Sequence, residues 1–253
     1  MDLGLKGLKA IVTGGSKGIG LKVVELLAAE GCDVGFCARG KAGVEAVAKR
    51  LEGAPGRVVG GVADVTESQG FRAWVTQTAQ DLGGLDILVA SASALGPAAK
   101  EEDWREGLEI DVLGTVRAVE AAMPFLEKSE RPSIVGLASA GAINTVGNTR
   151  AYGALKAAMI NYLSQLATNL GPKGIRANTV SPGAIFFEGG IWDKRKKEQP
   201  EMYEKAIARS PFKRFGRPEE VANAVVFLAS PAASYISGTN LMVDGAATTR
   251  VQF

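Results

Sequence analysis

Residues 9–20 read KAIVTGGSKGIG, an apolar segment that leads directly into a glycine-rich turn. The apolar residues 9–13 predict a β-strand, and the amphipathic residues 19–30 after the turn predict a helix. A strand, a glycine-rich turn and a helix in this order are typical of phosphate binding, because glycines let the backbone approach a pyrophosphate and the helix N-terminus favours its charge. Since tight loops use the same residues, the turn alone is weak evidence.

The rest of the chain continues the alternation of strands and helices. Apolar runs predict strands at 33–38, 57–62, 85–90, 133–137 and 175–180. Between them, helices are predicted at 41–51, 71–82, 104–125 and from 152 to about 170. Such alternation predicts an α/β fold with a doubly wound, Rossmann-like parallel sheet flanked by helices. No repeat or linker interrupts the pattern, so residues 1–253 are expected to form a single domain.

Composition narrows the possible functions. The net charge of +2 gives no reason to expect nucleic acid as a partner. No apolar run is long enough to span a membrane and the N-terminus does not resemble a signal peptide, so a cytoplasmic location is expected. The chain has no histidine, which excludes Ser-His-Asp catalysis and His-ligated metal sites, and no metal site is predicted. Cys32 and Cys37 are expected to be small buried residues and not a disulfide.

The end of the second predicted strand bears on the choice of cofactor. An acidic residue there would bind the free 2′-hydroxyl of NAD, but the sequence is Cys37-Ala38-Arg39. Arg39 is suited to a phosphate, and Lys17 in the glycine-rich turn adds a second positive charge. These residues favour NADP(H) over NAD. The alternative is that both are solvated surface charges.

Residues 151–156, AYGALK, place Tyr152 and Lys156 four residues apart. On a helix this spacing puts both side chains on one face. A nearby ammonium favours the phenolate form of a tyrosine, which makes the phenol usable for proton transfer. Ser139 follows the predicted strand 133–137, at the edge of the sheet where ligands of such folds bind. Alternatively, it is only a turn or cap residue.

These motifs, in this order, resemble those of the short-chain dehydrogenase/reductase family, and the resemblance extends from about Leu8 to Ala246. Beyond the glycine-rich turn, the matching features are Asp64-Val65, Ser139 thirteen residues before Tyr152, Lys156, Pro182-Gly183, Tyr235-Ile236-Ser237-Gly238 and Val243-Asp244-Gly245. No single motif is decisive, but the ordered set is specific.

The resemblance implies a role for each matching residue. Tyr152 would be the general acid in ketone reduction, Lys156 would favour its phenolate and hold the nicotinamide ribose, and Ser139 would hydrogen-bond the substrate oxygen. Asp64 and Val65 would contact the adenine. The complete set expected to bind the cofactor is Gly14, Ser16, Lys17, Gly18, Ile19, Gly20, Arg39, Asp64, Val65, Ala92, Tyr152, Lys156, Pro182, Gly183 and Ile185.

Three residues depart from the family pattern. Asp111 stands where the family often has an asparagine that helps to hold a water on the proton path, so it is also a candidate catalytic residue, although its charge could weaken the activation of Tyr152. Ser93 replaces a glycine beside the cofactor. Phe187 replaces a threonine, which predicts the loss of one cofactor hydrogen bond.

Residues 184–211 fall where the family has a mobile substrate lid. Ile185, Phe186, Phe187, Ile191 and Trp192 favour a hydrophobic or cyclic substrate, unless they only pack the lid onto the body. The basic run at 194–197 is typical of a solvated helix face. A sharper hypothesis is that it steers an anionic carrier such as an acyl thioester on a phosphopantetheine.

The sequence therefore predicts an NADP(H)-dependent oxidoreductase that interconverts a carbonyl and a secondary alcohol, with 3-oxoacyl-thioester reductases and reductases of cyclic ketones or steroids among the similar types. The alternative is a cofactor-binding protein with little turnover, acting as a redox sensor or structural partner. An NAD-preferring enzyme is a weaker possibility. The helix 152–170 and the segment 235–253 match regions through which the family often forms tetramers, which predicts a homo-oligomer.

Overall fold

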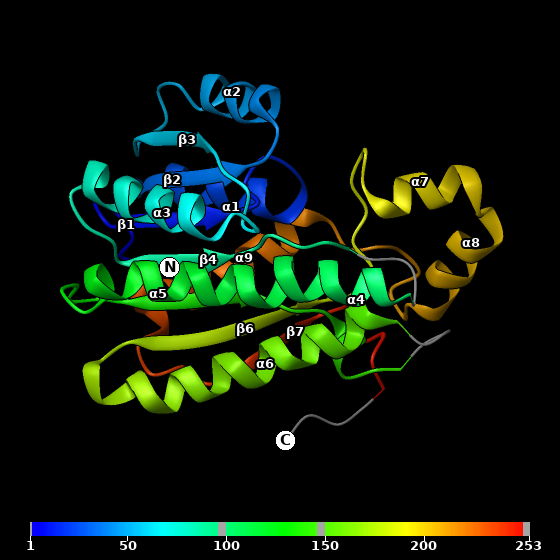
Figure 1. Cartoon of the computed structure of the whole chain (residues 1–253). Coiled ribbons are helices and arrows are strands. Elements are labelled where there is room, and N and C mark those ends of the chain that lie inside the picture. Colours follow the sequence, from blue (N-terminus) through cyan, green and yellow to red (C-terminus); the bar gives the residue numbers. More distant parts are fainter. Residues whose placement is uncertain (1, 96–99, 146–149, 250–253) are drawn as a thin grey trace.

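The computed structural model describes residues 2–95, 100–145 and 150–249, which form one layered α/β unit (Figure 1). Seven parallel strands lie in the order β3-β2-β1-β4-β5-β6-β7. They are β1 (Lys9–Thr13), β2 (Asp33–Ala38), β3 (Val58–Val62), β4 (Ile87–Ala90), β5 (Ser133–Leu137), β6 (Arg176–Pro182) and β7 (Asn240–Val243). The predicted doubly wound parallel sheet is confirmed. The strand order reverses between β1 and β4, which is where such sheets bind ligands.

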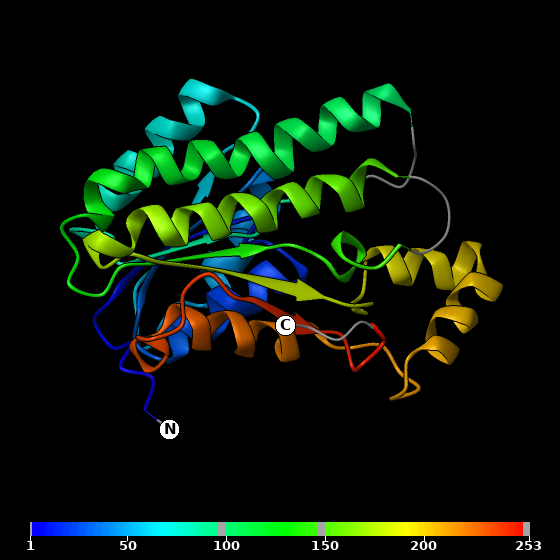
Figure 2. The same ribbon diagram turned by 90° about the horizontal axis from the view of Figure 1, so that it is seen from below.

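Helices cover both faces of the sheet (Figure 2). One face carries α1 (Gly18–Ala29), α2 (Lys41–Arg50) and α9 (Pro218–Ala229), whose apolar residues share one core cluster. The other carries α3 (Ser68–Leu82), α5 (Gly114–Leu126) and α6 (Ala151–Leu170), which share a second cluster. The central strands are buried on both sides, since parallel sheets are covered on both faces.

The long helix predicted at 104–125 is not regular. The structure has α4 (Glu101–Gly107), a π-helical turn η1 (Leu108–Leu113) and then α5. A π turn carries an i to i+5 hydrogen bond and often occurs at functional sites. It bears the buried Asp111. The predicted helix is therefore confirmed over its length, and the π turn within it was not predicted, because residue periodicity does not reveal one extra residue in a turn.

The lid segment contains two helices, α7 (Ile191–Glu198) and α8 (Pro200–Arg209). They project beyond the carboxyl ends of the strands, on one side of the body (Figures 1 and 2). Shorter 3-10 turns occur as η2 (Ala140–Ala142), η3 (Gly171–Lys173) and η4 (Pro231–Ala233). Within the described ranges, no helix combines the length and apolar character needed to cross a membrane. Of the predicted oligomer segment 235–253, residues 250–253 lie outside the described residues.

Candidate functional site

A cavity of about 1810 Å³ opens between the carboxyl edge of the sheet and the lid helices. All the residues predicted to bind the cofactor line this cavity, and so does Ser139. Residues far apart in sequence therefore meet at one site. The candidate catalytic residue Asp111 is the exception. It is absent from the lining and lies behind Lys156.

The glycine-rich turn between β1 and α1 forms one end of this cavity. Gly14 and Gly18 have φ angles of +69° and +57°, which favour glycine. A Cβ on Gly20 would lie 2.4 Å from the carbonyl oxygen of Gly14, so a larger residue would disrupt the turn. Because these glycines have no side chains, the backbone of the turn is accessible to a ligand at the start of α1. This cradle fits a pyrophosphate.

The end of the cavity near β2 carries positive charge. Lys17 and Arg39 are exposed and line the cavity, consistent with a site for an additional phosphate. Asp64 and Val65 lie beside them at the end of β3. Asp64 is held in place because the backbone N–H and the hydroxyl of Thr66 donate to its Oδ1, at 3.0 and 2.9 Å.

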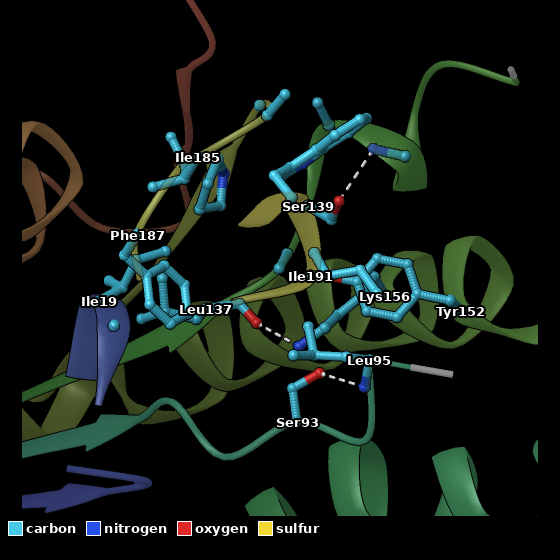
Figure 3. Close-up of a pocket in the computed structure, with 18 of the residues that line it drawn as sticks. Ile19, Ser93, Leu95, Leu137, Ser139, Tyr152, Lys156, Ile185, Phe187 and Ile191 are labelled. Atoms are coloured by element: carbon cyan, nitrogen blue, oxygen red, sulfur yellow. Dashed lines mark hydrogen bonds between the residues drawn. The ribbon is translucent and has the colours of Figure 1, made fainter. Parts of the chain in front are cut away.

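Lys156, in the wall of the cavity, is held by contacts from two sides. Its Nζ donates to the carbonyl oxygen of Leu137 at 2.7 Å and lies 2.8 Å from Oδ1 of Asp111 (Figure 3 shows the Leu137 bond). Both charged side chains are only 2% exposed. The other oxygen of Asp111 accepts the backbone N–H of Ala94 at 3.1 Å. The sequence suggested that the charge of Asp111 could weaken the activation of Tyr152. In the structure, Asp111 forms a buried ion pair with Lys156.

Tyr152 stands beside Lys156 in the first turn of α6. The ammonium lies 5.8 Å from the centroid of the Tyr152 ring. A Cβ on Gly153 would come within 2.6 Å of the carbonyl oxygen of Gly141, so the glycine permits α6 to approach η2 closely. Ser139 caps η2, and its Oγ accepts the N–H of Gly141 at 3.1 Å. The Ser139 hydroxyl hydrogen is left to donate to a ligand.

The backbone after β4 forms the wall next to the glycine-rich turn. Thr13 Oγ1 accepts the N–H groups of Ser91 and Ala92, at 3.0 and 3.1 Å. Ser93, which replaces a family glycine, accepts the N–H of Leu95 through its Oγ at 3.3 Å. Leu95 has a φ of +53°, an uncommon conformation for a residue with a branched side chain, and its side chain lines the cavity (Figure 3).

Phe187 contacts the glycine-rich turn from the lid side. Its ring would lie 2.8 Å from a Cβ on Gly18, and Figure 3 shows it beside Ile19. The ring therefore spans from the lid segment to the turn, at the position where the family often has threonine. Ile185 is 8% exposed, and its neighbours Ala184 and Phe186 pair with the backbone of Gly216, which anchors the start of the lid.

The aromatic residues of the lid segment divide into two groups. Phe186 and Trp192 contact Phe215, with ring centroids 6.4 and 4.8 Å away, and Tyr203 joins the cluster at 4.8 Å from Phe215. Of the five apolar residues that the sequence singled out, four line the cavity, namely Ile185, Phe187, Ile191 and Trp192. Phe186 therefore packs the lid onto the body, Trp192 both packs and lines the cavity, and Ile185, Phe187 and Ile191 line the cavity. The preference for a hydrophobic or cyclic substrate stays a prediction.

The two cysteines are buried, as predicted, and neither is in a disulfide. Burial raises the pKa of each thiol to about 12. Cys37 lies at the cavity wall but is only 1% exposed. Thiols in this state are protonated near neutral pH and unreactive.

Comparison with known proteins places the chain among oxidoreductases. A family model described as enoyl-(acyl carrier protein) reductase matches residues 14–248. Isoepoxydon dehydrogenase of Penicillium expansum is 40% identical over 257 residues, which cover 100% of this chain and 99% of the relative. The 3-oxoacyl-[acyl-carrier-protein] reductase FabG of Thermotoga maritima is 34% identical, covering 95% of this chain and 98% of the relative.

A solved structure is similar over the whole chain. L-sorbose reductase from Gluconobacter frateurii, determined in complex with NADPH and L-sorbose, has a TM-score of 0.90 and 31% identity. The match covers 99% of this chain and 100% of that one. The similarity therefore includes the lid segment as well as the sheet.

Proposed function

The chain belongs to the short-chain dehydrogenase/reductase family of oxidoreductases, and we propose that it uses NADP(H) to interconvert a carbonyl and a secondary alcohol on a hydrophobic or cyclic substrate. The observation that carries this proposal is the meeting of Ser139, Tyr152 and Lys156 in one cavity with the glycine-rich turn. A non-catalytic protein would have no chemical need for all three side chains beside a phosphate cradle.

Each of the three residues has a distinct task in the proposed reaction. Tyr152 donates its phenolic proton to the carbonyl oxygen during reduction and accepts it during oxidation. Ser139 donates a hydrogen bond to the same oxygen and stabilises its developing negative charge. Lys156 supplies a fixed positive charge beside the phenol, which favours the phenolate after proton transfer. The nicotinamide cofactor, when bound, supplies or accepts the hydride.

Asp111 acts through Lys156, because it does not line the cavity. The carboxylate of Asp111 and the carbonyl of Leu137 hold the ammonium of Lys156 from two sides, and the side chain of Lys156 still lines the cavity. We therefore assign Asp111 a positioning role. The ion pair holds Lys156 in place, and because Lys156 lines the cavity and Asp111 does not, the ammonium is the charge beside Tyr152.

Different parts of the cavity are proposed to bind the pyrophosphate, the additional phosphate and the nicotinamide of the cofactor. The turn from Gly14 to Gly20 would hold the pyrophosphate, and Lys17 with Arg39 would bind the additional phosphate of NADP(H). Pro182, Gly183 and Ile185 would border the nicotinamide. Support for NADP(H) also comes from the similar L-sorbose reductase, whose structure contains NADPH.

Fluorescence titration of the purified protein with NADPH and NADH tests the cofactor. We expect NADPH to bind at least tenfold more tightly, about 1.4 kcal/mol in free energy. Oxidation of NADPH is then followed with a panel of hydrophobic ketones, cyclic ketones and acyl thioesters. Turnover of at least one class is the predicted result, and tight NADPH binding with no turnover in the whole panel would favour the sensor hypothesis.

A further inference from the structure

The basic run at 194–197 does not behave as one solvated face. Lys194 and Lys197 are exposed and lie 3.9 Å from Glu198 and 3.4 Å from Asp193. Arg195 instead turns inward, is partly buried and lines the cavity. Its guanidinium carbon lies 4.7 Å from the centroid of the Trp192 ring, which also lines the cavity. Stacking on the indole fixes the plane of the guanidinium.

A second arginine faces the same space from the body of the protein. Arg150 is the N-cap residue of α6, two positions before Tyr152, and it is partly buried and lines the cavity. Arg150 and Arg195 thus line one cavity from different elements, the start of α6 and the lid helix α7. In keeping with this placement, burial lowers the pKa of Arg195 and the charge of Arg150 lowers it further. Two like charges brought together in this way are stabilised by an anion between them.

No protein carboxylate supplies that anion among the described residues, where neither Arg150 nor Arg195 takes part in an ion pair. Two acids do line this part of the cavity, Glu198 and Glu201. Each already has a partner, since Glu198 lies 3.9 Å from Lys194, and Glu201 lies 3.8 Å from Lys205. Three arginines line this end of the cavity without an ion pair in the described part of the chain, namely Arg150, Arg195 and Arg209. Arg209 is exposed to solvent, whereas Arg150 and Arg195 are partly buried, so these two have the greater need of a bound anion.

We infer that Arg150 and Arg195 form a binding site for an anionic oxygen group of the substrate, a carboxylate or a phosphate, whose apolar body lies along Ile191 and Trp192. Guanidinium groups bind such groups through paired N–H donors, which fixes orientation as well as affinity. The inference rests on the proposed function and deepens it, because the anion would hold the carbonyl near Tyr152. Arg150 is well placed for this, since it precedes Tyr152 on the same helix.

The phosphate groups of the cofactor are proposed to bind elsewhere in the cavity. Lys17 lies in the turn after β1 and Arg39 follows β2, whereas Arg150 lies at the start of α6 and Arg195 lies on the lid helix α7. The two pairs of cations therefore lie on different elements, and they are expected to act on different molecules.

Three ketones with one scaffold test the inference, namely 4-acetylbenzoate, 4-acetylphenyl phosphate and the neutral methyl 4-acetylbenzoate. With saturating NADPH, we expect kcat/KM of the wild type to be at least tenfold higher for one of the two anions than for the ester, and the favoured anion identifies the group. Arg150→Gln and Arg195→Gln should each lower that ratio at least tenfold. Lys197→Gln is the matched control, because Lys197 is exposed on the same helix and neither it nor its partner Asp193 lines the cavity, and it should keep the ratio within twofold of wild type.

A binding measurement separates the inference from the proposed function. Benzoate, phenyl phosphate and benzamide are titrated calorimetrically into the NADPH-bound protein and into its Arg195→Gln variant. If an anion binds more tightly than benzamide and this difference is lost in Arg195→Gln, the result supports the anion site. It does so even if no ketone is turned over, because the absence of turnover would refute only the proposed function. Turnover with an unchanged anion-to-ester ratio in both arginine variants, or equal binding of benzoate, phenyl phosphate and benzamide, would overturn the inference and leave the function standing.

Discussion

The two ends of the cavity are built in different ways. The cofactor end is made by strand ends, the glycine-rich turn and α6, and its buried lysine is compensated by Asp111. The substrate end is made by α7 and α8, where Arg195 stacks on Trp192 and has no carboxylate partner among the described residues. The residues of the sequence motifs that line the cavity lie at the cofactor end, and none of them comes from α7 or α8.

This difference separates what is common to the fold from what is particular to the chain. At the cofactor end, close contacts such as Gly20 against Gly14 leave little freedom to vary the residue. At the substrate end, an aromatic cluster around Phe215 holds the lid, and many other apolar residues could pack equally well. Substrate specificity is therefore expected to depend on the lid, and cofactor binding on the turn.

The largest effect on stability is expected from breaking the buried ion pair. Asp111→Leu leaves the ammonium of Lys156 buried without its counter-charge, which should lower the free energy of unfolding by about 3–5 kcal/mol in a urea titration. The exposed pair of Glu101 and Arg105 provides the control, because Glu101→Gln should cost less than about 1 kcal/mol. Equal losses for the two variants would contradict the description of Asp111 and Lys156 as a compensated, buried ion pair.

The lid should respond separately from the body. Phe215 is 8% exposed beneath the lid helices, and Phe215→Ala removes its contacts with Trp192 and Tyr203, at a cost of roughly 3 kcal/mol. Trypsin should then cleave the basic run at 194–197 at least tenfold faster, because cleavage follows the population of the open lid. Phe212→Ala, in the same loop but 64% exposed, should leave the rate within twofold. No acceleration in Phe215→Ala would show that the cluster does not hold the lid.

These expectations depend on features that the sequence reveals unequally. Six of the strands, their parallel, doubly wound arrangement and the residues of the glycine-rich turn could be predicted, because apolar runs and the spacing of the turn are visible in the sequence. The strand β7 (Asn240–Val243) was not predicted. The π turn at Leu108–Leu113 could not be predicted, since apolar periodicity continues through it. The family resemblance placed the charge of Asp111 near Lys156, but the direct ion pair between these residues, 45 positions apart in sequence, is visible only in the fold. The basic run at 194–197 was visible, but not that Arg195 alone turns inward.

Arg39 offers a smaller change at the cofactor end. Arg39→Ala should reduce the preference for NADPH over NADH about tenfold, or about 1.4 kcal/mol, because one of two exposed cations at this end is lost. Lys41→Ala is the matched control, since Lys41 is exposed two positions away and is not part of the cavity wall. A preference that did not move in Arg39→Ala would remove Arg39 from the proposed phosphate site.

The smallest expected effect concerns the thiols. Because burial raises the pKa of Cys32 and Cys37 to about 12, a thiol reagent at pH 8 should meet roughly one thiolate in ten thousand, and labelling should be negligible until the protein unfolds. Opening of the lid in Phe215→Ala should not change this, since Cys37 belongs to the sheet. Rapid labelling of Cys37 in the native protein would mean that the cofactor end opens as readily as the lid, because Cys37, unlike Cys32, lies at the cavity wall.

The most direct test of the account is Tyr152→Phe, which removes the phenolic proton and keeps the ring. With a ketone that the wild type reduces, NADPH oxidation should fall at least a hundredfold, because general acid catalysis is lost. Binding of NADPH, measured by fluorescence in the same preparation, should remain detectable. Turnover within twofold of the wild type would contradict the assignment of Tyr152 as the proton donor, and with it the proposed mechanism.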